Sequence, residues 1–543
     1  MEIHAVACGL TRALPTGPLG RLLAAWLLIG TGGWAFMIAL AVYAFDRSGV
    51  GSVAAATAAR LVPAMLAAPV AGNVVDRGNR ARVVTVACVL QAASFAGAAI
   101  LIESDAPLGT VLGFAAISGI VGTAARPALA ALMPALARTP AELTRATALW
   151  SATDSGAFLL GSGVGGLAIA ATGPVAIVAV GVVAVGLAAV CAAGLPTVLA
   201  SAADEPGVAE PALRAALAGL RALVDARDLR VPFGLFAILL LLQGMSDVQL
   251  VGLAIGPLGM GSGGPGELYA IWGVGGLIGS GLMLRVVRRR GYGLALAAGV
   301  VAFGAALAVA GADGTGLALT AMIPVGIGFS LVETAVMALV ARLADDAVIG
   351  RVYALSELLY TGVAGIGAIV AAPLIDAVGL GASLGLVGGA FAVAGILSWG
   401  VSARLDAGQE DAGIVRDLLR RLPFLGPLPL PRLERLVRQA RPIAFPAGAT
   451  IISAGEHGED FFVIEDGIVD VVEFARQMGP GEGFGEIALL RDIPRTATVR
   501  AQTDVRVRAL ARPVFISAVT QHEDAGREAH AVVETHLARP RRL

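Results

Sequence analysis

The sequence places Gly483-Phe484-Gly485-Glu486-Ile487-Ala488-Leu489 shortly before Pro494-Arg495-Thr496-Ala497-Thr498-Val499. Gly485 lets the backbone approach a ligand closely, and a helical turn that begins near Glu486 would point amide N–H groups at an anion. Arg495 supplies a planar fork of donors for phosphate oxygens. Because the Glu486 carboxylate would repel a phosphate, it is better suited to accept a hydrogen bond from a sugar hydroxyl. The pattern therefore predicts a site for a phosphorylated sugar.

These residues resemble the phosphate-binding cassette of cyclic nucleotide-binding domains, and the resemblance extends over about residues 411–540. Turns upstream are similar to those of this family's β-roll, and they lie at Pro446-Ala447-Gly448, Gly455, Gly458, Asp460 and Gly467. The resemblance implies that Glu486 binds the ribose 2′-hydroxyl and that Arg495 binds the cyclic phosphate. It also implies that the amides near Ile487 and Ala488 complete the cradle after Gly485.

Thr496 bears on the choice of nucleotide. In the family a threonine at this position is associated with cGMP, but bacterial members with threonine also resemble cAMP binders, so we favour cAMP over cGMP as the regulatory ligand. A β-roll that has kept its shape and lost its ligand is the alternative. The last helix, about residues 522–539, is expected to act as a lid over the nucleotide.

The rest of the chain is too apolar for an ordinary soluble protein. Of its 543 residues 57% are hydrophobic and 15% are charged, and the mean hydropathy is +0.81. A membrane-crossing helix needs about 20 apolar residues. Twelve segments meet this requirement, at 21–45, 51–75, 82–103, 108–135, 144–172, 174–198, 231–258, 267–288, 293–312, 316–342, 351–376 and 380–403. The sequence thus predicts an α-helical membrane protein with a C-terminal β-roll and flanking helices.

The twelve segments form two similar halves. Arg145-Ala146-Thr147-Ala148-Leu149 aligns with Arg351-Val352-Tyr353-Ala354-Leu355, which indicates a doubled six-helix unit. We therefore expect four parts, namely a first half at 1–199, a charged connector at 200–230, a second half at 231–404 and a nucleotide-binding domain at 405–543.

Arginines gather in alternate connections between the segments, whereas the other connections offer almost only Arg47. The arginine-rich side is formed by Arg77, Arg80, Arg82, Arg138, Arg145, Arg285, Arg288, Arg289, Arg290 and Arg351. By the positive-inside rule these loops, both termini and the nucleotide-binding domain are cytoplasmic. We expect a multi-pass protein of the inner (plasma) membrane.

A tight turn after the second segment reads Gly72-Asn73-Val74-Val75-Asp76-Arg77-Gly78-Asn79-Arg80. An acid followed by arginines can form a charge clasp that closes in one conformation and opens in another. The turn resembles the loop signature of the major facilitator superfamily, over about residues 18–404. The resemblance implies a twelve-helix transporter fold in which Gly72, Asp76, Arg77 and Arg80 gate the cytoplasmic side.

Two further patterns resemble particular branches of that superfamily. Gly161-Ser162-Gly163-Val164-Gly165-Gly166 is similar to the glycine-rich motif of its antiporters, with Ser162 in place of the usual proline. Arg126-Pro127-Ala128, Pro134 and Glu142-Leu143 are similar to drug and siderophore exporters, which favours export over uptake.

Ionisable side chains within membrane segments are costly and usually face a cavity or a partner. In the superfamily the first, fourth, seventh and tenth helices line the substrate path, so the resemblance implies that Arg126, Asp247 and Glu333 face it. Asp154 lies beside the glycine-rich motif and could carry a proton. Arg126 and Glu333 could form a switchable pair, and Arg60 could form a structural pair with Glu357. A static buried ion pair, or a side chain that reaches the membrane interface, is the alternative for each residue.

We therefore predict a secondary transporter, an exporter of a small molecule, regulated by cAMP or cGMP. A non-transporting receptor and an exporter of the nucleotide itself are the alternatives.

The sequence has no nucleophile–base pair, Walker loop or metal cluster, so we expect neither an enzyme nor a metal site, and no cofactor beyond the regulatory ligand. Cys8, Cys88 and Cys191 have no metal-ligand spacing. We expect no nucleic-acid partner, and a homodimer stays open.

Overall fold

The computed structural model describes residues 17–136, 140–196, 227–312, 314–343, 346–426 and 430–520, together with 221, 428, 527 and 528. The chain divides into two compact units, Met1–Ala403 and Arg404–Leu543. Nearly all of the predicted connector and of the predicted lid helix lies outside the described residues.

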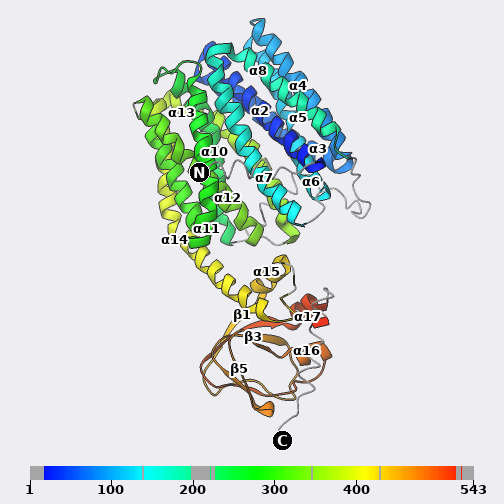
Figure 1. Ribbon diagram of the computed structural model, residues 1–543. Coiled ribbons are helices and arrows are strands. Elements are labelled where there is room, and N and C mark those ends of the chain that lie inside the picture. The colour runs from blue at the N-terminus through cyan, green and yellow to red at the C-terminus, as the bar shows by residue number, and fades with distance from the viewer. Residues whose placement is uncertain are drawn as a thin grey trace, which may run out of the picture. The chain divides into compact units, whose positions relative to one another are not determined.

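The first unit is built from helices (Figure 1). Their bounds are α2 (Pro18–Ser48), α3 (Val50–Arg77), α4 (Arg80–Glu103), α5 (Leu108–Gly122), α6 (Ala125–Leu136), α7 (Pro140–Phe158), the π-helix η1 (Leu159–Val164), α8 (Gly165–Ala193), α10 (Arg227–Ile255), α11 (Gly264–Ala310), α12 (Thr315–Leu343), α13 (Asp346–Val378) and α14 (Leu380–Arg421). Ten helical stretches among the described residues are long and apolar enough to cross a membrane.

Two glycines divide helices that would otherwise be continuous. Gly173 in α8 has φ 76° and ψ 167°, and Gly291 in α11 has φ 86° and ψ 177°. A positive φ strongly favours glycine, and Pro174 directly after Gly173 cannot continue the hydrogen-bond ladder. Two predicted segments therefore meet at each of these glycines.

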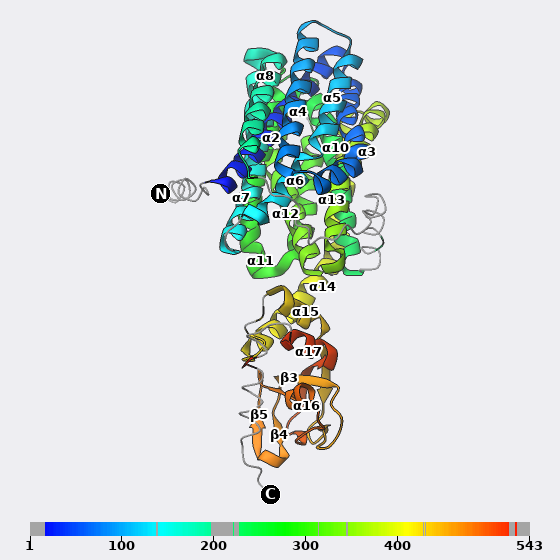
Figure 2. The same ribbon diagram turned by 90° about the vertical axis from the view of Figure 1, so that its right-hand side faces the viewer.

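Small residues allow the helices of the two halves to approach closely. A Cβ atom on Gly166 of α8 would lie 2.4 Å from the Cα of Gly266 in α11, and one on Gly163 of η1 would lie 2.9 Å from the Cα of Ala270. In a bilayer such close backbone packing replaces the hydrophobic driving force that acts in water. Helix α3 of the first half also packs against α13 of the second. Within the first half α3 lies beside α5, as Figure 2 shows.

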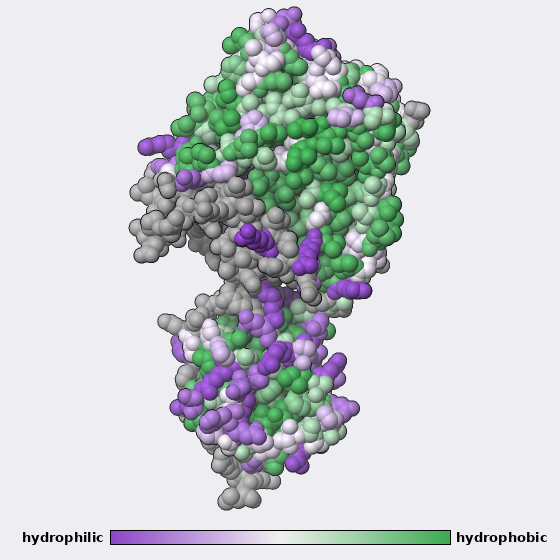
Figure 3. All heavy atoms as spheres, turned by 180° about the vertical axis from the view of Figure 1, so that it is seen from behind, coloured by the Kyte–Doolittle hydropathy of each residue, from purple (hydrophilic) through white to green (hydrophobic). Residues whose placement is uncertain are grey.

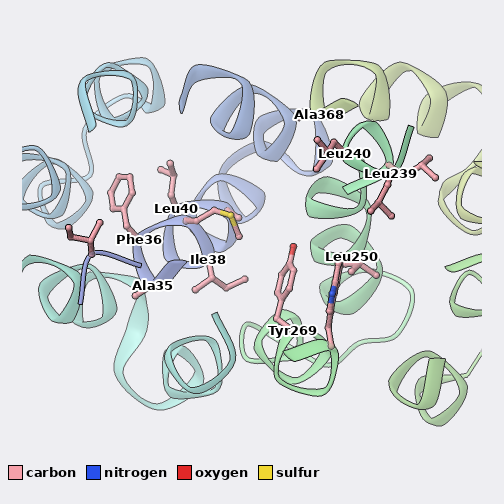
Figure 4. Packing of buried hydrophobic residues seen from close by; sticks show 14 of the residues in the cluster. Ala35, Phe36, Ile38, Leu40, Leu239, Leu240, Leu250, Tyr269 and Ala368 are labelled. Carbon is pink, nitrogen blue, oxygen red and sulfur yellow. The ribbon is translucent and has the colours of Figure 1, made fainter. Parts of the chain in front are cut away.

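The core of this unit is apolar and continuous across the halves. It includes Phe36 and Ile38 of α2, Leu239 of α10 and Tyr269 of α11, each no more than 1% exposed. In Figure 4 the Tyr269 side chain lies between Ile38 and Leu250. Figure 3 shows a broad hydrophobic face on the helical unit, which suits contact with lipid.

The second unit contains the C-terminal end of α14, the helices α15 (Leu430–Gln439), α16 (Glu486–Arg491) and α17 (Arg512–Thr520), and two sheets. The antiparallel sheets have the strand orders β1-β8-β3-β6 and β2-β7-β4-β5. The strands are β1 (Arg441–Phe445), β2 (Thr450–Ile452), β3 (Asp460–Asp466), β4 (Val469–Val471), β5 (Arg476–Met478), β6 (Gly483–Phe484), β7 (Val499–Ala501) and β8 (Val505–Ala511).

Strand β3 is buried on both faces, so its apolar run is continuous. Phe461 and Val463 pack with the helices in one hydrophobic cluster, whereas Phe462 and Ile464 pack inside the roll. The first cluster, which we call the helix-facing core, also contains Leu419 of α14, Leu489 of α16 and Phe515 of α17. A single strand thus connects the interior of the roll with its covering helices.

Candidate functional site

The predicted phosphate cassette begins at Gly485, which precedes α16 with φ 95° and ψ 0°. A Cβ atom there would lie 2.5 Å from the Nη1 atom of Arg495, and a Cβ atom on Gly458 would lie 2.7 Å from its Cζ atom. Both glycines therefore make room for one guanidinium. The left-handed conformation of Gly485 also directs the chain into the short helix α16.

The Arg495 side chain is held by main-chain carbonyls and is only 6% exposed. Its Nη1 donates to the Gly485 carbonyl at 2.8 Å, and its Nη2 donates to the Asp460 carbonyl at 2.6 Å. Burial lowers the pKa of the Arg495 guanidinium, and the negative charges of Asp460, Glu486 and Glu456 oppose this shift. A guanidinium has five N–H donors, so this anchoring leaves donors for an anion.

The other predicted cassette residues lie around this guanidinium. Glu486 is the first residue of α16 and is 4% exposed, and its charge acts on Arg495. Ile487 and Ala488 follow in the first turn of α16, where amide groups lack partners within the helix. Thr496 is half-buried next to Arg495 in the chain. The structure thus gathers a cation, a carboxylate and helix-start amides at one place.

An ion triad that was not predicted from the sequence lies on the helix-facing side of the sheet; Arg508 and Glu465 are largely buried in it, whereas Asp411 is about half exposed. Arg508 of β8 donates from Nε to Glu465 and from Nη2 to Asp411 of α14, each at 2.7 Å. Burial lowers the pKa of Arg508, but the hydrogen bonds and charges of Glu465 and Asp411 raise it by more. We call these three residues the α14 triad.

A register shift explains how Glu465 joins the α14 triad. The pairing of β3 with β8 shifts between Ile464 and Asp466, so Glu465 has no partner in the ladder. Such a bulge re-aims a side chain. The continuous apolar run of β3 gave no signal for this shift, which arises from pairing with a strand far along the chain.

In the helical unit the predicted transport residue Arg126 contacts several groups. Its Nη2 lies 3.7 Å from an Asp154 carboxylate oxygen, and its Cζ lies 5.4 Å from the Trp26 ring and 5.6 Å from the Tyr360 ring. The hydroxyl of Tyr360 donates to Glu333. Tyr360 therefore links Arg126 of the first half to Glu333 of the second.

The predicted residue Asp247 occupies a second charged cluster. It is 7% exposed, it accepts a hydrogen bond from the Tyr269 hydroxyl at 3.2 Å, and it interacts electrostatically with Arg60. The Nε atom of Arg60 is buried and has no hydrogen-bond partner among the described atoms. The Glu357 side chain lies outside the described residues, so its predicted pairing with Arg60 stays a prediction.

The predicted gating turn is described only in part. Arg80 donates from Nη1 to the Ala131 carbonyl at 3.4 Å, and a Cβ atom on Gly72 would meet no other atom within 4 Å. The side chains of Asp76 and Arg77 lie outside the described residues.

Tyr360 and Tyr269 were not predicted, although each is an aromatic with a hydroxyl on an apolar helix that also carries or faces an acid.

Family models match both units. The model of the Major Facilitator Superfamily matches residues 22–368, and the model of the Cyclic nucleotide-binding domain matches residues 442–522. Together with the helices and sheets described above, these matches confirm the predicted fold class.

Individual proteins resemble parts of the chain. The cAMP-dependent protein kinase regulatory subunit of Colletotrichum orbiculare is 35% identical over 104 residues, which are 18% of this chain and 27% of that protein. The same subunit of Aspergillus niger is 33% identical over 131 residues, 23% of this chain and 32% of that protein. The chain thus spans about a third or less of these curated relatives' length. The solved structure of the nucleoside transporter NupG has a TM-score of 0.57 at 13% identity, covering 72% of this chain and 100% of that one, which shows a likeness of fold.

Proposed function

This chain belongs to the Major Facilitator Superfamily, and we propose that it is a secondary active transporter that exports a small molecule under the control of a cyclic nucleotide, cAMP rather than cGMP. The proposal assigns no catalytic reaction to the chain. The observation that carries the regulatory part is the anchored Arg495 guanidinium beside Glu486 and the start of α16.

A cyclic nucleotide suits this arrangement chemically. Its phosphodiester carries one negative charge, which the Arg495 guanidinium and the amides of Ile487 and Ala488 can bind. Its ribose offers a 2′-hydroxyl that can donate to Glu486. The names of the similar kinase regulatory subunits support cAMP as the nucleotide.

The nucleotide site has a route to the helical unit through α14. Leu489 of α16 and Leu419 of α14 belong to the same helix-facing core. The α14 triad adds a hydrogen-bonded ion pair to this apolar contact, because Arg508 of β8 binds Asp411 of α14. Since α14 is one helix from Leu380 to Arg421, a change at its C-terminal end can act on its membrane portion.

The transport step is proposed to use the charges that link the halves. Arg126 can exchange between Asp154 and Glu333, with Tyr360 between them, as the cavity changes its access. Protonation of a carboxylate would release the cation, which is a general means of coupling proton movement to transport. Export is favoured by the Arg126-Pro127-Ala128 pattern, and cytoplasmic termini in a plasma membrane are favoured by the distribution of arginines.

The test uses the full chain reconstituted in proteoliposomes, with calorimetry for cAMP and cGMP and a pH-sensitive dye for proton flux. Arg495→Ala should weaken cAMP binding by at least about a hundredfold, because a hydrogen bond to a charged group is worth about 1.5–3 kcal/mol and at least two would be lost. Arg506→Ala is the control, since Arg506 forms an exposed ion pair with Asp466 on the same sheet.

Each outcome decides part of the proposal. Proton flux that persists in Arg495→Ala but no longer responds to cAMP would support regulation and exclude the nucleotide as cargo. If calorimetry detects no binding of either cAMP or cGMP, the domain does not sense a cyclic nucleotide and the regulatory part of the proposal is wrong. Binding without any proton flux would contradict proton-coupled transport and favour a receptor.

A further inference from the structure

A groove of about 470 Å³ lies between α3, α4 and α5, and its lining contains no residue of the charged clusters described above. Small residues in its lining are buried or half-buried, and we call these the bottom of the groove; they include Ala67, Ala71, Ala87 and Ala124. Large apolar side chains along it are exposed, by 66% for Val70, 50% for Val74, 51% for Val86, 49% for Leu90 and 41% for Ile120. The groove is thus open and hydrophobic along its length.

The groove lies on helices that can cross a membrane, which limits the kinds of molecule that can occupy it. All three helices lie in stretches that are apolar enough to cross a membrane. Open apolar surface on such helices faces hydrocarbon, and water gains nothing by entering a groove without polar partners. A hydrocarbon chain is therefore the occupant that the walls favour.

One end of the groove is polar and positively charged. Arg82 is exposed there, and no hydrogen bond or ion pair of its side chain is found within the described part of the chain. The Asn79 side chain accepts a hydrogen bond from the Arg82 backbone amide at 3.3 Å, which fixes the start of α4. Arg80, by contrast, donates to the Ala131 carbonyl.

We propose that this groove binds an anionic phospholipid, with an acyl chain along the alanine-lined bottom and the phosphate against Arg82. The lipid complements both ends of the groove, since its acyl chain is apolar and its headgroup carries a negative charge opposite to that of Arg82. Arginines near a membrane surface attract anionic lipid headgroups. Arg82 is separate from the residues assigned to gating, transport and nucleotide binding.

The experiment measures lipid binding to the purified full chain in detergent by native mass spectrometry, with phosphatidylglycerol, phosphatidylcholine or inorganic phosphate added. The wild-type chain should retain phosphatidylglycerol about fivefold better than phosphatidylcholine, the factor that one arginine near an anionic surface supplies. Arg82→Gln should remove this preference, and Arg82→Lys should keep it.

Two further variants separate the groove from general surface charge. Ala67→Phe should weaken the binding of both lipids, because the ring occupies the bottom of the groove, and a thermal melt checks that this variant is folded. Arg285→Gln removes another exposed arginine of the helical unit and should change nothing.

Three results would overturn the proposal. The first is an Arg82→Gln chain that keeps the preference for phosphatidylglycerol. The second is an equal loss in Arg82→Gln and Arg285→Gln, which would indicate non-specific charge attraction. The third is binding of inorganic phosphate as strong as that of the lipid, which would show that the apolar groove contributes nothing.

Discussion

Two carboxylates within the helical unit share one local arrangement. Asp247 accepts a hydrogen bond from Tyr269, and Glu333 accepts one from Tyr360. An arginine from the first half accompanies each of them, Arg60 in the first case and Arg126 in the second. A phenolic donor and a nearby cation together reduce the cost of keeping a carboxylate out of water.

The Tyr360 hydroxyl should matter for transport. Tyr360→Phe keeps the ring beside Arg126 and removes the hydrogen bond to Glu333, so proton flux in proteoliposomes should fall by roughly tenfold or more, as for the loss of a bond to a charged group. Tyr43→Phe is the control, because Tyr43 donates to the Ala106 carbonyl elsewhere in the helical unit. Equal flux in both variants would contradict the role given to Tyr360.

Arg60 and Asp247 carry opposite charges that interact within the helical unit, so the stability of the chain should depend on both. Asp247→Asn removes a negative charge that acts on Arg60 and should destabilise the chain by up to the roughly 3–5 kcal/mol of a broken buried ion pair, whereas Arg60→Met combined with Asp247→Leu should recover most of this loss. The measurement is the midpoint of thermal unfolding in detergent. A double variant as unstable as Asp247→Asn would show that the two charges do not compensate each other.

At the scale of helices and strands, close packing depends on where side chains are missing. Gly166 and Gly266 bring α8 and α11 into backbone contact, whereas Gly186 of α8 has open space around it. Glycine costs stability within a helix, so a glycine at a contact is useful only when a neighbouring backbone occupies the space.

This difference predicts unequal effects of one substitution at two places in the same helix. Gly166→Val should lower the thermal stability by an amount at or above the roughly 1–3 kcal/mol of an overpacked core, because backbone atoms of Gly266 cannot move aside easily. Gly186→Val should be tolerated. The comparison is made by thermal melts of both variants in the same detergent, and similar losses would argue against the contact.

Local patterns predicted much of this architecture. The predicted membrane segments end and begin on either side of Gly173 and Gly291, and the 483–499 pattern predicted the cassette. The interaction of Arg60 with Asp247 and the contacts of Arg508 were not predicted in this way. Their contacts join residues that are far apart in the chain, and the bulge at Glu465 depends on the pairing of β3 with β8.

For the whole molecule, α14 is the element that both units share in sequence. It begins at Leu380 among the membrane helices and ends at Arg421, beyond the unit boundary after Ala403. Asp411 lies on its C-terminal portion and is tied to Arg508. Regulation requires that the nucleotide favours one arrangement of this portion over another, because a ligand shifts an equilibrium only by its difference in affinity.

Asp411→Asn should therefore separate sensing from response. The cAMP affinity should stay within about twofold of the wild type, while the change in proton flux on adding cAMP, worth about 1–3 kcal/mol for typical coupling, should largely disappear. Asp466→Asn is the matched control, since Asp466 pairs with Arg506 at the surface. Unaltered control of flux by cAMP in Asp411→Asn would exclude the α14 triad as the connection.

The two carbonyls that hold Arg495 have a consequence for signalling. Because the Arg495 guanidinium is already held in place before the anion binds, binding cannot be signalled by an inward movement of this side chain. The conformational change on binding must therefore begin in other groups that contact the phosphodiester. The first turn of α16 is the main candidate, together with Leu489, which packs in the helix-facing core. We therefore expect the Arg495 guanidinium to stay in place when the nucleotide binds and the first turn of α16 to be the part that moves.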